Sequence, residues 1–205
     1  MQRWEAPSTK PTIMNKKDQI FTDIYCMDQS TNLYMIEIAL NHYTDIFNQW
    51  DPAPFKRREI DPDLESYLLR SSDEIPFKKS IELCFIVPQE QRDEKMEEES
   101  RQGLKNSFAF KIYLFKKEIK RANSRIIDFI FVGFISLGMA TIYSDNSTAV
   151  VTSVFFQALV ISGWVFIWEA ISLLFFKNRE FYHRYRTYKR LQNAPVIFTE
   201  KENTP

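Results

Sequence analysis

The chain has 205 residues, and its 27 basic and 27 acidic side chains give a formal net charge of zero, so no whole-protein field attracts nucleic acid. About 50 residues lie in two apolar runs near the C-terminal half, which leaves room for one soluble domain of roughly 100 residues and tails. This length excludes a large enzyme. The mean hydropathy of −0.33 averages these apolar runs against very polar flanks.

The N-terminal part of the chain predicts a loose arm over residues 1–30. This stretch is polar, carries Pro7 and Pro11, and contains one strand-like segment, QIFTDIYC (19–26). It has no basic start followed by an apolar core, the pattern of a secretory signal. We therefore expect an arm that is not cleaved.

Residues 31–90 predict a small cytoplasmic α+β domain of the βαβ type. The stretches NLYMIEIAL (32–40) and SIELCFIV (80–87) are nearly continuous apolar runs, which is typical of buried parallel strands. Between them, Asp61 can cap a helix that starts at Pro62 and runs to about residue 73. A third strand would come from QIFTDIYC or from the ending PVIFTE; otherwise one edge of the sheet stays open for a partner.

The segment DPAPFKRREIDPD (51–63) is a candidate regulatory loop, because its prolines forbid a continuous helix. Two interpretations stay open. The loop could sense a phosphate or a nucleotide, or it could be a solvated loop with local ion pairs. The residues concerned are the bases Lys56, Arg57 and Arg58 and the acids Glu59, Asp61 and Asp63.

Residues 91–125 predict a long connecting helix that continues to residue 143. No proline occurs from residue 91 until Pro195, and apolar residues such as Phe108 and Ile112 recur at helical spacing. Unbroken, this helix would span ~80 Å at 1.5 Å per residue, with Gly103 and 122–124 as candidate kinks. It would act as a rigid lever between the domain and the membrane.

No lysine or arginine occurs between Arg125 and Lys177, and this stretch predicts a transmembrane hairpin. Its apolar runs, 126–143 and 149–176, approach or exceed the ~20 residues needed to cross a ~30 Å hydrocarbon core. The loop 144–148 has no basic residue, whereas both flanks are rich in them. By the positive-inside rule, both termini and the tail 177–205 are expected in the cytoplasm and the loop on the periplasmic side.

Polar residues inside the apolar runs are candidate functional residues, because an ionisable group at a bilayer centre costs ~2.5 to 3.5 kcal/mol or more. Counting from the loop predicts an interfacial ion pair between Arg125 and Glu169, with Asp128 slightly deeper and able to snorkel. Gln157 lies deeper still. It should form a hydrogen bond to another helix, within the hairpin or across an oligomer.

Ala158, Ser162 and Glu169 fall on one line of a helical wheel and form a groove of small residues that ends in a carboxylate. This pattern favours close helix packing. Two interpretations stay open: ordinary packing of the hairpin on itself, or a homo-oligomer in which Ser153, Gln157 and Ser162 line a path for water and ions.

Nothing in the sequence forms a catalytic constellation. There are two histidines, two cysteines and four glycines, and no nucleophile elbow, zinc-protease motif or phosphate-binding glycine loop. We therefore expect a protein that is not an enzyme, with no cofactor, no metal site and no small-molecule substrate.

Several stretches resemble a family of small bacterial two-pass membrane proteins. They are DPAPFKRREIDPDLESYL, SIELCFIVP, LVISGWVFIWEAISLLFF and YKRLQNAPVIF. After Trp168 the family usually has Arg-Pro and a later Glu, whereas this chain has Glu169, Ala170 and Ser172. The overall plan is also similar to the transmembrane effector of retron antiphage systems.

The resemblance implies a function in abortive infection. A reverse transcriptase with its RNA-DNA hybrid would hold the effector inactive, and phage attack would release it to permeabilise the bacterial inner membrane. The expected partners are thus the lipid bilayer, further copies of the chain and that reverse transcriptase. The alternative is a passive membrane anchor or scaffold that recruits a cytoplasmic partner.

Overall fold

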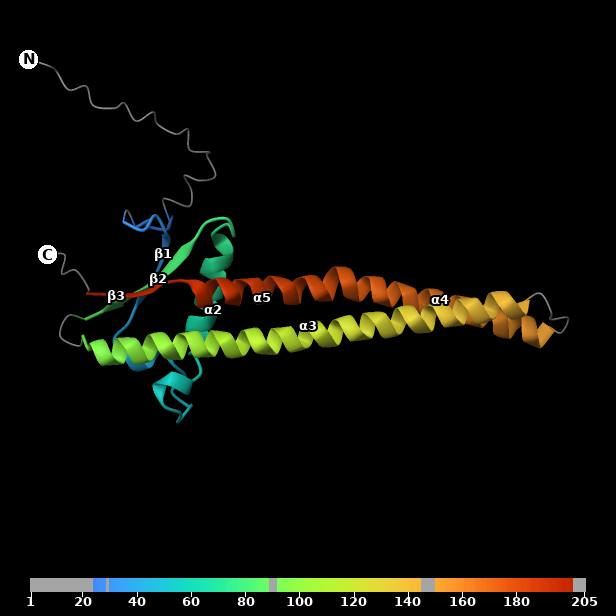
Figure 1. The fold of residues 1–205 in the computed structure, drawn as a ribbon, viewed down its shortest axis with the longest axis horizontal. Helices are drawn as coiled ribbons and strands as arrows, with labels where there is room; N and C mark the ends of the chain where they lie inside the picture. The colour runs from blue at the N-terminus through green and yellow to red at the C-terminus, as the bar shows by residue number, and fades with distance from the viewer. Residues whose placement is uncertain (1–23, 29, 89–91, 145–149, 201–205) are drawn as a thin grey trace, which may run out of the picture.

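The computed structural model describes residues 24–28, 30–88, 92–144 and 150–200. It is mostly helical, with a long two-helix hairpin and a small three-stranded sheet at one end (Figure 1). The sheet and the short helix α2 lie at the end opposite the hairpin tip. The expected combination of an apolar hairpin, a long helix and a small α+β unit is therefore present.

The sheet contains β1 (Tyr34–Ala39), β2 (Ile81–Val87) and β3 (Val196–Glu200), in the order β1-β2-β3. Both pairs are parallel, which confirms the predicted pairing of the first two strands. The third strand comes from the C-terminal ending. The first part of the alternative segment, 19–23, lies outside the described residues.

Two short 3-10 turns, η1 (Tyr43–Ile46) and η2 (Phe55–Arg57), precede α2 (Pro62–Glu74). The start of α2 is as predicted. The Asp61 carboxylate accepts hydrogen bonds from the backbone amides of Asp63 and Leu64, and Pro62 occupies the first turn, where no amide donor is needed.

The hairpin consists of α3 (Glu94–Ser144) and a second helical run made of α4 (Val150–Ser172), a π-helical turn η4 (Leu173–Lys177) and α5 (Asn178–Asn193). The 51 residues of α3 form one helix through both candidate kink positions. The sequence did not predict α5, which makes a helix of most of the segment expected to be a tail.

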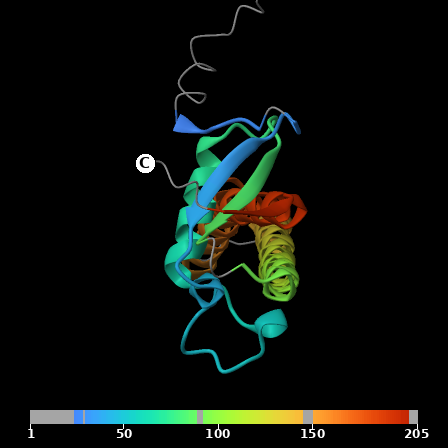
Figure 2. The ribbon, with the colours of Figure 1, turned by 90° about the vertical axis from the view of Figure 1, so that its left-hand side faces the viewer.

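The hydrophobic core extends beyond the predicted domain of 31–90. The helices that contribute to this core cover one face of the sheet, as the view along the hairpin shows (Figure 2). Leu104 and Phe108 of α3 and Leu191 of α5 are almost fully buried in the same core as the strand residues. The first half of α3 is thus part of the domain, so it is not an isolated lever.

The C-terminal strand closes this core. The ring of Phe198 stacks on Phe85 of β2 at a centroid distance of 5.4 Å. At the outer edge of β3, Arg101 of α3 donates its Nε–H to the carbonyl of Val196. Arg101 thus occupies one hydrogen-bonding position on the edge of β3, and β1 forms the other edge of the sheet.

Candidate functional site

The outer surface of the hairpin is apolar. Two helical runs, 94–142 and 153–193, are long and apolar enough to cross a membrane by length and composition. Large side chains such as Phe131, Trp168 and Phe176 are 65%, 72% and 77% exposed. A soluble monomer seldom exposes a continuous apolar patch of more than a few hundred Å². We therefore expect lipid or another protein surface to cover it.

The two arms of the hairpin pack through glycines. A Cβ atom at Gly163 of α4 would lie 2.7 Å from Cγ of Leu137 and 3.1 Å from the carbonyl oxygen of Gly133 on α3. Ala140 on α3 and Ala170 on α4 are also buried. Small residues thus allow close approach of the backbones, as in many membrane helix pairs.

This finding corrects the interpretation of the groove formed by Ala158, Ser162 and Glu169 as ordinary hairpin packing. The interface residue Gly163 lies about 100° to 140° around the helix from these three positions at 100° per residue. Ala158 and Glu169 are exposed, and Ser162 is half-buried and donates its hydroxyl to the carbonyl of Leu159. The groove faces away from α3.

The predicted ion pair between Arg125 and Glu169 is wrong, since it is absent from the ion pairs of the described residues, and both side chains are exposed. The reason is the register of the hairpin. Gly133 contacts both Gly163 and Ile167 and so faces position 165 on average; eight residues further from the tip, Arg125 faces position 173. Counting residues from the loop instead places Arg125 at the level of Glu169, four positions away from the residue that it faces.

Gln157 and Asp128 both point outward from the hairpin. Within the part of the chain that the structure describes, the Gln157 side chain forms no hydrogen bond, so the option of a partner inside the hairpin is not realised. An outward glutamine on an apolar helix still needs a partner in lipid. What remains of the prediction is a contact to another helix across an oligomer.

Asn123 and Asn178 form a polar contact that sequence reasoning missed. The Nδ2 of Asn178 donates to Oδ1 of Asn123 at 2.9 Å, and Asn178 is buried directly after the π-helical turn. The contact joins α3 to α5 below the apolar part of the hairpin. No local pattern indicates it, because the two residues are 55 positions apart.

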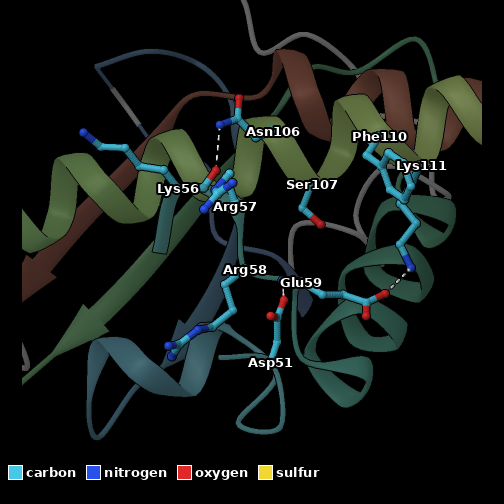
Figure 3. A pocket seen from close by; sticks show the side chains of 9 residues that line it. All are labelled: Asp51, Lys56, Arg57, Arg58, Glu59, Asn106, Ser107, Phe110 and Lys111. Carbon is cyan, nitrogen blue, oxygen red and sulfur yellow. Dashed lines mark hydrogen bonds and ion pairs between the residues drawn. The ribbon is translucent and has the colours of Figure 1, made fainter. Parts of the chain in front are cut away.

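The predicted regulatory loop lies against α3 (Figure 3). Asn106 of α3 donates its Nδ2–H to the carbonyl of Lys56 at 2.8 Å. A Cβ atom at Gly103 would collide with the carbonyl oxygen of Phe55, so only glycine lets the loop sit this close to the helix. Lys56 and Arg57 are exposed, while Arg58 is half-buried.

The local ion pairs expected within this loop are absent among the described residues. Glu59 pairs instead with Lys111 of α3, which also contacts Glu65 of α2, each at 3.1 Å. Burial lowers the pKa of Lys111, but the two carboxylates more than offset this, and its pKa is raised overall. The side chain of Asp61 serves as the cap of α2.

Asp51 organises the other side of the loop. Its carboxylate accepts hydrogen bonds from the backbone amides of Glu59 and Ala53 at 2.8 and 2.9 Å, which lower its pKa. Arg58 donates its Nε–H to the carbonyl of Ala53, and its guanidinium lies over the ring of Phe55. These contacts give the loop a defined conformation.

Comparisons with family models, with curated proteins and with solved structures found no match for this chain.

Proposed function

We propose that the protein is a two-pass membrane effector that associates through its hairpins and permeabilises the bacterial inner membrane, under the control of its cytoplasmic domain. The resemblance to retron effectors supports an antiphage setting, in which a reverse transcriptase with its RNA-DNA hybrid restrains the protein until infection. The observation that carries the proposal is the outward position of Gln157 on the apolar hairpin, where its side chain has no partner among the described residues.

The exposed surface of the hairpin supports a lipid environment. The stretch between Arg125 and Lys177 lacks basic residues, and its outer face carries large apolar side chains. Trp164, Trp168 and Phe176 lie toward the base of the hairpin, where aromatic rings favour the membrane interface.

The two faces of α4 support association between copies. Gly163 and Ala170 are occupied by α3, so the small-residue groove and Gln157 are left on the outside. Polar and small residues on a lipid-exposed face are typical of helix interfaces in membranes. A second hairpin would satisfy the amide of Gln157 and bring polar groups together across the bilayer.

The alternative is a passive anchor or scaffold. The observation that favours it is the edge position of β1. Met35 already donates its amide to the carbonyl of Cys26, and the carbonyl of Glu37 accepts from Tyr67, so a strand of a cytoplasmic partner could pair only with the end of β1 near Ala39. Such a protein needs no contact between hairpins.

Release of a trapped dye from vesicles separates the two functions. We expect the full chain, reconstituted in phosphatidylethanolamine–phosphatidylglycerol vesicles, to cause leakage. Gln157→Leu should lower the leak rate by about threefold to thirtyfold, because an interhelical hydrogen bond in a membrane contributes roughly 0.6 to 2 kcal/mol. The matched control is Val154→Leu, which changes an exposed apolar residue on the same helix.

If vesicles that contain the fully incorporated wild-type protein release no dye, the effector function is rejected and the scaffold function remains. Equal leakage with Gln157→Leu and Val154→Leu would reject the role of the glutamine in the pathway.

A further inference from the structure

A cavity lies between the loop 51–59 and the outer face of α3. It has a volume of about 490 Å³, within the ~300 to 1,000 Å³ range of small-molecule sites. Figure 3 shows Asn106, Ser107 and Lys111 projecting from α3 on one side, with Asp51 and Glu59 on the loop opposite.

Most charged side chains around the cavity already have polar partners. Asp51 accepts backbone amides, Glu59 pairs with Lys111, and Arg58 contacts a carbonyl and an aromatic ring. The side chains of Arg57 and Lys56 are different. Both are exposed, and within the described ranges neither forms an ion pair or a hydrogen bond through its side chain. The lining contains four cationic side chains and two carboxylates, so the net charge at the cavity is positive.

Ser107 supplies a second, independent feature. The residue is only 9% exposed, yet its hydroxyl forms no hydrogen bond within the described part of the chain. It projects from α3 toward the loop, into the cavity (Figure 3). The hydroxyl is not among the fully buried side-chain atoms without a partner, so it is accessible from the cavity and can donate a hydrogen bond to a ligand there.

Phe110 adds an aromatic surface next to this hydroxyl. It lies three residues after Ser107, on the same face of α3, and is 59% exposed although it lines the cavity. Exposed aromatic rings beside basic side chains are the usual platform for stacking a nucleobase. A guanidinium without an acidic partner suits a phosphate.

We propose that this cavity binds a mononucleotide. Arg57 and Lys56 contact its phosphates, Ser107 donates a hydrogen bond, and Phe110 stacks on the base. A lipid headgroup does not fit the position. In the proposed membrane arrangement, Phe110 lies 16 residues before Ile126, which begins the apolar run, and therefore ~24 Å away along α3.

Equilibrium dialysis of the full chain in nanodiscs tests the site with ATP, GTP, inorganic tripolyphosphate and a ten-residue oligothymidylate. We expect saturable binding of at least one nucleotide. Arg57→Ala should weaken it about tenfold or more, since a charge-assisted hydrogen bond contributes ~1.5 to 3 kcal/mol. Phe110→Ala should bring nucleotide affinity down to that of tripolyphosphate. The matched control is Lys117→Ala, an exposed cation further along α3.

Circular dichroism of each variant verifies that it is folded, which is expected because the substituted side chains are exposed. Three results would overturn the proposal: no binding of either nucleotide at 1 mM, equal loss in Arg57→Ala and Lys117→Ala, or binding of the oligonucleotide alone. The readout needs no leakage, so failure of the site and failure of the membrane function are distinguishable.

Discussion

At the scale of single residues, the half-buried Arg190 and the buried Glu82 differ in how well their charges are solvated by the protein. Arg190 of α5 donates to four backbone carbonyls, one in α2 and three between α2 and β2: those of Ser72, Ile75, Pro76 and Lys79. Its guanidinium lies over the ring of Phe77, while its Nε has no partner among the described residues. Glu82 of β2 is 1% exposed, and within the described ranges its carboxylate has one weak contact, to Thr31 at 3.4 Å, while its other oxygen has no partner. The arginine locks α5 onto the domain, while the glutamate is a source of instability.

Glu82 should make stability fall as the pH rises. Burial and the nearby charge of Asp28 raise its pKa above the ordinary value of 4.5. Below 4.5 both the folded and the unfolded chain are protonated there. As the pH rises through the folded pKa, the unfolded chain binds fewer protons, and stability is lost. We expect Glu82→Gln to raise the free energy of unfolding at pH 7 by at least about 1 kcal/mol, with little effect at pH 4.

Chemical unfolding in detergent at both pH values measures this difference. Glu37→Gln is the control, because Glu37 is an exposed carboxylate on the adjacent strand β1. A gain at pH 7 no larger than that of the control would contradict the argument.

At the scale of elements, α3 serves two structures at once. Its first half buries Leu104 and Phe108 in the domain core, and its second half packs against α4 through Gly133. The second arm does the same, since α4 and α5 form one helical run interrupted by the π-helical turn Leu173–Lys177. Such turns often occur at functional sites. Both arms of the hairpin are thus continuous with helices that pack in the domain core.

Close packing of the hairpin makes Gly163 sensitive to substitution. We expect Gly163→Ala to lower the stability of the protein in bicelles by about 1 to 3 kcal/mol, because its Cβ would lie 2.7 Å from Leu137 and 3.1 Å from a backbone oxygen. Gly138→Ala is the matched control. A Cβ there has no atom within 4 Å, and alanine is a better helix former. Thermal unfolding with equal shifts for both variants would refute this packing.

At the scale of the whole molecule, the chain returns to the domain that contains the sheet. After the hairpin, α5 and β3 go back to the domain, and β3 pairs with β2 beside residues more than 100 positions earlier. The chain therefore enters and leaves the hairpin at the same end, next to the sheet (Figure 1). An even number of passes follows if the hairpin spans a membrane.

A reporter fusion tests this topology in cells. Both flanks of the hairpin are basic, so we expect alkaline phosphatase inserted at Asn146 to be active and green fluorescent protein inserted there to be dark. The control fusions after Pro205 should show the opposite pattern. Fluorescence of the green fluorescent protein inserted at Asn146 would exclude the two-pass arrangement.

The sequence by itself determined most of the elements, with α5 as the exception. Composition and periodicity located the hairpin, the long helix and the first two strands, and Asp61 and Pro62 marked the start of α2, because such signals depend on neighbours along the chain. The ending PVIFTE was a candidate strand, but only its contact with β2 distinguished it from QIFTDIYC. The loop cations were visible as well.

Only the tertiary structure decided how these elements meet. It placed Gly163 rather than Ala158 at the hairpin interface, shifted Arg125 away from Glu169, and joined Asn123 to Asn178. It also brought Ser107 next to the loop of Arg57 to form a cavity. These outcomes depend on which faces approach and in which register, and side chains far apart in sequence determine both.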